Sequence, residues 1–372
     1  MNINTKVDYK VPPLSLAELE LVAFIDLEWT REKALSELKT HLQVAIEVEL
    51  ATIPVYLYSY YSINRTPGDF PSDEISRFAD KAGALIMSVA VEEMLHMSLS
   101  SNVLFALGQD PQLYKKSPEP YPTNLPGHAK LGPDAKPLQI PLAKFSIEQL
   151  WKFLEIEYPA KADAPPEGSD WETIGQIYSY VRCIISSCHI NDSDFQQGSK
   201  KYQIQSTNYS PNNIDTAYPD ANFNKTTPVP AGTKGSASEV AKFASREDSH
   251  VGKAELINVS SCKDAMQAIA TISFQSEGFD HSKVDDASEQ ELSHYYKFLT
   301  LQSELKGYPL PTSGEPLPKH PKPPEAAKTQ FDADDLAQFV YNFPSNPAAV
   351  NIDDEQRAGW RLMFRVACIN IC

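Results

Sequence analysis

Apolar residues recur at spacings of three and four in four long stretches of the chain. Such spacing places the apolar side chains on one face of a helix. It predicts helices over about residues 32–63, 74–107, 261–277 and 288–306. Gly108 follows the second stretch as a helix-ending residue. At the start of the fourth, Ser288 and Glu291 have capping-box spacing.

The remaining segments predict a long insertion and a C-terminal extension. Residues 108–260 hold two shorter helical patterns, SIEQLWKFLEIEYP and about 171–188, and then a polar stretch. A segment that long inside a domain is typical of a lid or a covering excursion. The chain becomes Pro-rich after residue 306, and DEQRAGWRLMFRVACI predicts one more helix. We therefore predict an all-α protein with one domain over 1–306 and an extension over 307–372.

Charge and cysteine content restrict the class of protein. The 372 residues carry a formal net charge of -16, and this excludes the basic surface that nucleic acid requires. The N-terminus lacks a secretory pattern, and we find no apolar stretch long enough to span a bilayer, so we expect a soluble, cytoplasmic protein without a membrane partner. None of the cysteines forms a CxxC pair, which favours reduced thiols over disulfides or a zinc site. They are Cys183, Cys188, Cys262, Cys368 and Cys372.

Carboxylates occupy the apolar faces of the first two predicted helices. Glu49 falls in the apolar row of the first helix, and Glu93 and His96 fall in that of the second. Glu92 is turned about 100° away from Glu93 and is expected to reach a different surface. Because burying an unpaired charge costs several kcal/mol, these groups need partners in the core.

The third and fourth predicted helices supply such groups. Glu277 ends the apolar row of the third helix, and Glu291 with His294 lies in that of the fourth. One Glu from each of two helices and Glu-x-x-His from two others is the ligand pattern of ferritin-like dimetal carboxylate proteins. Four carboxylates balance two divalent cations, and oxygen and imidazole donors without thiolate favour iron, with manganese as the alternative.

Glu157 is a further candidate, since it ends an apolar row just before Pro159. It could replace Glu277 or Glu291 as a ligand, or act behind the ligands. The candidate metal ligands are therefore Glu49, Glu93, His96, Glu157, Glu277, Glu291 and His294.

Several segments together resemble a known family. They are HLQVAIEVELATIPVYLYSYYSI, VAVEEMLHMSLSSNVLFALGQDPQL, YPTNLPG, FLEIEYP, TIGQIYSYV, ISFQSEG and ELSHYYKF. Over about residues 40–305 the chain resembles the ferritin-like domain of the iminophenylpyruvate dimer synthase family, from violacein and rebeccamycin-type biosynthesis. The resemblance implies a four-helix metal-binding bundle and, for the named enzymes, oxidative coupling of an imine derived from an aromatic amino acid.

The resemblance also bears on individual ligands. It supports each candidate ligand except Glu291, which matches less securely. Phe274 and Gln176 stand where the relatives tend to carry acids. If either acid is a metal ligand in the relatives, the site of this chain is altered.

These patterns predict a ferritin-like four-helix bundle with long loop insertions. We expect a non-haem dimetal oxidoreductase that uses O2 or peroxide to oxidise a small organic substrate, in specialised metabolism. Self-association into a homo-oligomer is left open. Two alternatives remain: an iron-binding ferroxidase of the ferritin type, and a metal-free helical scaffold whose inward acids bond to one another and to histidine.

Overall fold

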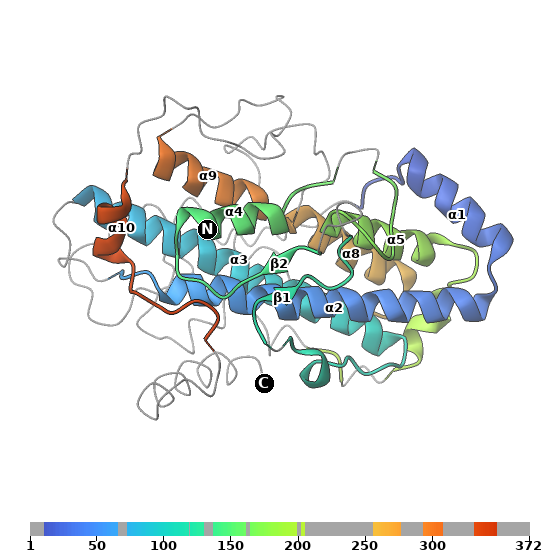
Figure 1. The fold of residues 1–372 in the computed structure, drawn as a ribbon. Helices are drawn as coiled ribbons and strands as arrows, with labels where there is room; N and C mark the ends of the chain where they lie inside the picture. The colour runs from blue at the N-terminus through green and yellow to red at the C-terminus, as the bar shows by residue number, and fades with distance from the viewer. Residues whose placement is uncertain are drawn as a thin grey trace, which may run out of the picture.

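The protein is described by a computed structural model in which residues 11–65, 73–118, 120–129, 137–160, 164–198, 202–204, 256–276, 293–307 and 331–347 are placed. Helices dominate these residues, which confirms the predicted all-α class (Figure 1). The helices are α1 (Leu16–Glu28), α2 (Arg31–Tyr61), α3 (Asp73–Ala106), α4 (Ile147–Ile156), α5 (Ile174–Ser186), α8 (Cys262–Ser276), α9 (His294–Lys306) and α10 (Ala333–Phe339). The short elements are the 3-10 turns η1 (Tyr114–Lys116) and η2 (Asp192–Gln196), and the antiparallel strands β1 (Thr123–Asn124) and β2 (Gln139–Ile140).

Two long helices, α2 and α3, form the spine of the bundle and run antiparallel. Gln43 in the first half of α2 accepts a hydrogen bond from the backbone of Gln112, just beyond α3, at 2.8 Å. Further along α2, Thr52 donates to Glu93 near the middle of α3 at 3.1 Å. Figure 1 shows the two helices lying along each other.

Two pairs of shorter helices complete the bundle. Along α2, Tyr178 of α5 donates to Glu49, and Glu157 at the end of α4 accepts from Tyr56. The helices α4 and α5 thus follow one another along α2. Both segments belong to the stretch that the sequence assigned to an insertion, and the structure uses them as a wall of the bundle.

The helices α8 and α9 follow one another along α3 in the same way. Gln275 near the end of α8 contacts His96, whereas Glu304 near the end of α9 accepts from Lys81. The helix α4 packs on α9, and α5 packs on α8. Both walls are therefore interrupted at the level of the middle of α3, and this level holds the buried polar groups.

Capping residues set the helix ends. Thr30 and Ser146 accept hydrogen bonds from backbone amides at the starts of α2 and α4, and Gly307 ends α9 with a left-handed backbone. Ser293, which is extended, caps α9 through Tyr296 N. The predicted start at Ser288 is therefore wrong: α9 begins at His294, because Ser293 supplies the cap nearer to the apolar row.

Two short helices of the structure, α1 and α10, were not predicted from the sequence. The first helix, α1, starts with a capping box between Ser15 and Glu18, and α10 starts with one between Asp332 and Asp335. Both carry few buried residues, so their apolar rows are weak signals. The helix expected in DEQRAGWRLMFRVACI lies outside the described residues.

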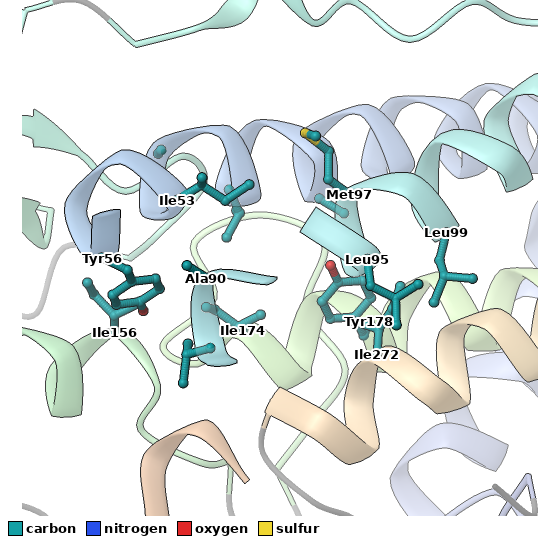
Figure 2. Packing of buried hydrophobic residues seen from close by; sticks show 14 of the residues in the cluster. Ile53, Tyr56, Ala90, Leu95, Met97, Leu99, Ile156, Ile174, Tyr178 and Ile272 are labelled. Atoms are coloured by element: carbon teal, nitrogen blue, oxygen red, sulfur yellow. The ribbon is translucent and has the colours of Figure 1, made fainter. Parts of the chain in front are cut away.

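The core between the helices of the bundle contains apolar side chains from α2, α3, α4, α5 and α8 (Figure 2). By length and composition alone, the stretch Glu74–Ala106 of α3 could cross a membrane, which corrects the statement that no stretch is long enough. However, 83% of its apolar window is buried inside the protein, as in a core helix of a globular bundle.

Candidate metal centre

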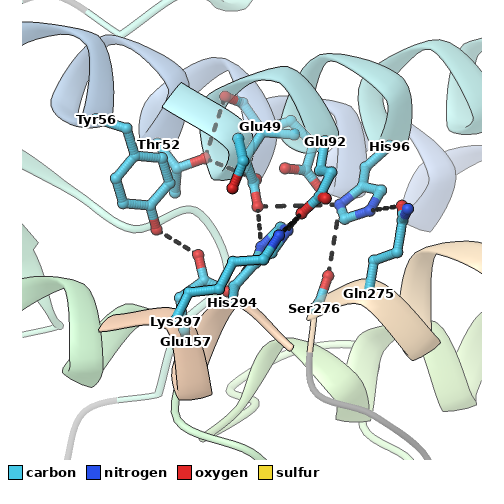
Figure 3. Close-up of polar contacts among 12 residues, drawn as sticks. Glu49, Thr52, Tyr56, Glu92, His96, Glu157, Gln275, Ser276, His294 and Lys297 are labelled. Atoms are coloured by element: carbon cyan, nitrogen blue, oxygen red, sulfur yellow. Dashed lines mark hydrogen bonds and ion pairs between the residues drawn. The ribbon is translucent and has the colours of Figure 1, made fainter. Parts of the chain in front are cut away.

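Three carboxylates and two imidazoles meet where the two helix walls are interrupted. Glu49 comes from α2, Glu93 and His96 from α3, Glu157 from the C-cap of α4, and His294 from the first turn of α9. Each of these residues is at most 3% exposed. Figure 3 shows Glu49, His96, Glu157 and His294 gathered between the helices.

In this centre His294 lies between two carboxylates. Its Nδ1 lies 2.8 Å from Glu93 Oε1 and 3.4 Å from Glu157 Oε2. The Nδ1 of His96 lies 3.9 Å from the same Glu93 oxygen. Ligand atoms of Glu93, His96 and His294 all fall within 4.8 Å of one another, a spacing that can hold a metal ion.

Hydrogen bonds on the outer side of each ring determine which nitrogen faces the centre. The Nε2 of His96 lies 2.9 Å from the side-chain oxygen of Gln275, and the Nε2 of His294 lies 2.8 Å from Glu92 Oε2. Because both oxygens act as acceptors, both Nε2 atoms carry a hydrogen. Each Nδ1 is thereby left to face the centre, in the way that outer hydrogen bonds orient metal-binding histidines, and that of His96 also lies 3.4 Å from the hydroxyl of Ser276.

Two tyrosines hold the carboxylates by one oxygen each. Tyr178 donates to Glu49 Oε1 at 2.8 Å, and Tyr56 donates to Glu157 Oε1. Among the described residues, Glu49 Oε2 is buried without a hydrogen-bond partner, and the other oxygen of Glu157, Oε2, faces the ring nitrogen of His294 at 3.4 Å. Buried polar atoms are almost always paired. Buried acceptors that converge in this way fit a bound cation.

The pKa shifts in the centre reflect an excess of negative charge among buried groups. Burial and the neighbouring charge of Glu93 raise the pKa of Glu49 well above its usual range, and the same two causes raise the pKa of Glu157. Burial opposes ionisation of Glu93, but contacts with Glu49 and His294 outweigh it and lower its pKa to about 2.

The two histidines shift in opposite directions. Burial lowers the pKa of His96 to about 4. Burial also disfavours charge on His294, but the carboxylates of Glu157, Glu92 and Glu93 outweigh it and raise its pKa well above the usual range. Without metal, protons on Glu49 and His294 thus balance part of the negative charge.

Glu92 differs from its expected place at another surface. It is buried behind His294, and its Oε2 accepts from His294 Nε2 and, at 2.6 Å, from the buried ammonium of Lys297. Sequence reasoning missed Lys297, Gln275 and the bond from Tyr56 to Glu157. The spacing of three between His294 and Lys297 was an available signal, since it places both on one face of α9.

Two candidate ligands, Glu277 and Glu291, lie outside the described residues. The structure begins α9 at His294, and the roles of Glu277 and Glu291 as ligands stay predictions. Gln176, one of the departures from the related proteins, caps α5 instead: its side-chain oxygen accepts from the backbone of Thr173 at 3.1 Å. It therefore serves the helix start and is separate from the metal-ligand candidates of the described centre.

A comparison with protein families agrees with this helical architecture. The family described as ferritin-like matches residues 42–303. Among solved structures, the chain is similar to a ferritin-like protein from Caulobacter vibrioides, with 21% sequence identity, 72% of each chain covered and a TM-score of 0.40. The comparison with curated proteins gives no match.

Proposed function

The chain belongs to the ferritin-like family, and we propose that it is a non-haem oxidoreductase whose buried centre holds two metal ions, iron in preference to manganese. The carboxylates of Glu49, Glu93 and Glu157 and the Nδ1 atoms of His96 and His294 would hold the ions. Bound there, the ions would supply the activation of O2 or peroxide for oxidation of a small organic substrate.

The observation that carries the proposal is the convergence of buried ligand atoms on one point. Among the described residues Glu49 Oε2 has no hydrogen bond, and Glu93 Oε1 and Glu157 Oε2 face His294 Nδ1 at 2.8 and 3.4 Å, although Glu49, Glu157 and His294 are each held on their other side. Burying carboxylate oxygens and an imidazole nitrogen with unused lone pairs costs free energy unless a cation binds to them.

The surrounding residues would orient the ligands and exclude water. Tyr56 and Tyr178 fix one oxygen of their glutamates, and Lys297 neutralises Glu92 so that this acid can hold His294. All of these groups are buried, so the centre is separated from bulk solvent. The resemblance to iminophenylpyruvate dimer synthases supports a role in specialised metabolism. Self-association into a homo-oligomer belongs to the same proposal.

Metal analysis tests the centre directly. The full chain, purified without oxygen and reconstituted with Fe(II) or Mn(II), is expected to bind about two ions per chain, with anomalous scattering at the matching absorption edge. Glu93→Gln should bind fewer than one ion. Glu47→Gln is the matched control, because Glu47 lies on α2 close to Glu49 but pairs with Lys116 at the surface. Less than one ion per reconstituted wild-type chain would remove the proposal and favour a metal-free scaffold.

Oxygen chemistry separates the remaining functions. Reduced, iron-loaded protein should consume O2, and the Glu93→Gln variant should not. A small particle in light scattering fits the oxidoreductase, whereas a large closed shell that accumulates iron would favour a storage protein.

A further inference from the structure

A second cluster of potential metal ligands lies at the surface, where α1 meets the turn after α5. It consists of Asp26 in the last turn of α1, and Cys188 and His189, which follow the end of α5 at Ser186. Ligand atoms of the three residues lie within 4.8 Å of one another. We propose that this cluster, the α1 clamp site, binds a zinc-type divalent cation that fastens α1 to the bundle.

The ligands of the α1 clamp site are oriented by hydrogen bonds on their outer sides. His189 Nε2 lies 3.2 Å from the carbonyl oxygen of Ile25, and a carbonyl only accepts, so Nε2 carries the hydrogen and Nδ1 keeps its lone pair. The Oδ1 of Asp26 accepts from the backbone amide of Cys188 at 2.7 Å, which holds the carboxylate against the turn. The thiol of Cys188 is in no disulfide, interacts with Asp26 and is exposed, so an ion can reach it from solvent.

The backbone of the turn is also held in place. Arg31, the first residue of α2, donates to the carbonyl oxygen of His189 and pairs with Asp194 of η2. This guanidinium is therefore occupied by partners other than Asp26. The position of His189 relative to α1 depends on these bonds and is set before any ion arrives.

Helix electrostatics favour a cation at this point. The cluster lies at the C-terminal ends of both α1 and α5, where the helix dipole is negative. Neither helix has a basic residue in its last turn to compensate for it. A thiolate and a carboxylate would add two negative charges, which a divalent ion balances.

The donor types indicate the class of metal. Thiolate, imidazole and carboxylate together suit zinc, whereas the buried centre offers only oxygen and nitrogen donors among its described residues. Zinc bonds of about 2.0–2.3 Å would draw the ligand atoms to within about 4 Å, a small side-chain movement for an exposed cysteine. Three protein ligands leave the fourth position to water.

The position of α1 gives the site a role separate from oxidation. The ferritin-like match begins at residue 42, after α1 has ended. The ion would therefore hold an N-terminal helix against α5, whose Tyr178 donates a hydrogen bond to Glu49 of the buried centre. This inference does not depend on the proposed oxidoreductase function.

Cobalt(II) provides the test, because only a cysteine ligand produces a thiolate-to-cobalt absorption band in the near ultraviolet. Metal-free full chain titrated with Co(II) is expected to show this band, and Zn(II) should abolish it. Cys188→Ser should lose the band, whereas Cys262→Ser, which alters the other partly exposed thiol of the described chain, should keep it. Asp26→Asn and His189→Gln should weaken Co(II) binding at least about tenfold, since even outer-sphere losses cost about 10–100-fold.

Three results would overturn the proposal: no band in the wild-type chain, a band that survives Cys188→Ser, or unchanged affinity in both Asp26→Asn and His189→Gln. Glu93→Gln should retain the cobalt–thiolate band, so failure of the buried centre and failure of the α1 clamp site give different results. Circular dichroism of each variant separates loss of the site from loss of the fold.

Discussion

The buried centre and the cluster of aromatic rings around Phe78 lie on the same long helix, α3, but are stabilised in different ways. Toward its start, α3 supplies Phe78, which stacks on Phe331 with ring centroids 4.7 Å apart and also meets Phe145 and Phe339. At its middle, α3 supplies Glu93, which faces other acids and histidines. Burial alone stabilises the first region. In the second region, the negative charge of the clustered acids has to be balanced by protons or, on our proposal, by metal ions. The same bundle thus contains one region that is stable by apolar packing and another whose stability depends on pH and on bound ions.

Phe78→Ala should have the largest effect on stability. Removing a buried aromatic ring costs about 3–5 kcal/mol, so the free energy of unfolding measured with denaturant should fall by roughly that amount. Phe24→Ala on the exposed face of α1 is the control and should change it by less than about 0.5 kcal/mol. Folded Phe78→Ala protein should still bind its metal; loss of metal binding with the fold intact would contradict the separation of the two regions.

Lys297→Met should have the next largest effect and lower the free energy of unfolding by about 3 kcal/mol. It removes the ammonium group that pairs with the buried carboxylate of Glu92. The double variant Glu92→Gln/Lys297→Met should recover much of the loss, since it removes both charges. Equal destabilisation by the single and double variants would show that packing, and not charge, accounts for the effect. Lys152→Met, which breaks a surface pair with Glu155, should cost less than about 1 kcal/mol.

Glu49→Gln should make the metal-free protein more stable, by about 1–2 kcal/mol at alkaline pH, while weakening metal binding. The pKa of Glu49 is raised in the folded state, so folded protein retains this proton where unfolded protein has lost it. Its contribution is fully present below the unfolded glutamate pKa and is lost as the pH rises through the folded pKa. The free energy of unfolding, measured with denaturant across this pH range, should depend less steeply on pH in Glu49→Gln than in the wild-type chain. An unchanged slope would contradict the raised pKa of Glu49.

Ser293→Ala should have the smallest effect, about 1 kcal/mol, because it removes the hydroxyl that caps α9. Since His294 is the next residue, the same change should reduce metal affinity when measured by titration. Ser293→Asp restores a cap and should recover stability. A stability loss in Ser293→Ala without any change in metal affinity would show that the cap does not position His294.

The long helices were predictable because their apolar rows are long. The predicted ranges 32–63, 74–107 and 261–277 correspond to Arg31–Tyr61, Asp73–Ala106 and Cys262–Ser276 within two residues at each end. The start of α9 was misplaced because two serines in the same segment, Ser288 and Ser293, both offer a capping side chain.

Within the centre, the inward direction of Glu49, Glu93 and His96 was predicted from their helices. The burial of Glu92 was not, because a helical wheel shows the angle between two residues but not which face a neighbouring helix covers. Here α9 covers the face of Glu92 and supplies both His294 and Lys297 to it. Glu157 was one alternative among several until Tyr56 and His294 were found beside it.

The sequence by itself determined that long amphipathic helices form and that acids and histidines interrupt their apolar rows, because both follow from spacing within one segment. Only the tertiary structure decided that α4 and α5 form a wall of the bundle, that the interruptions of both walls meet at one level, and that Asp26 reaches Cys188 and His189. These contacts join residues far apart in the chain, and their distances depend on how whole helices pack, which no local pattern encodes.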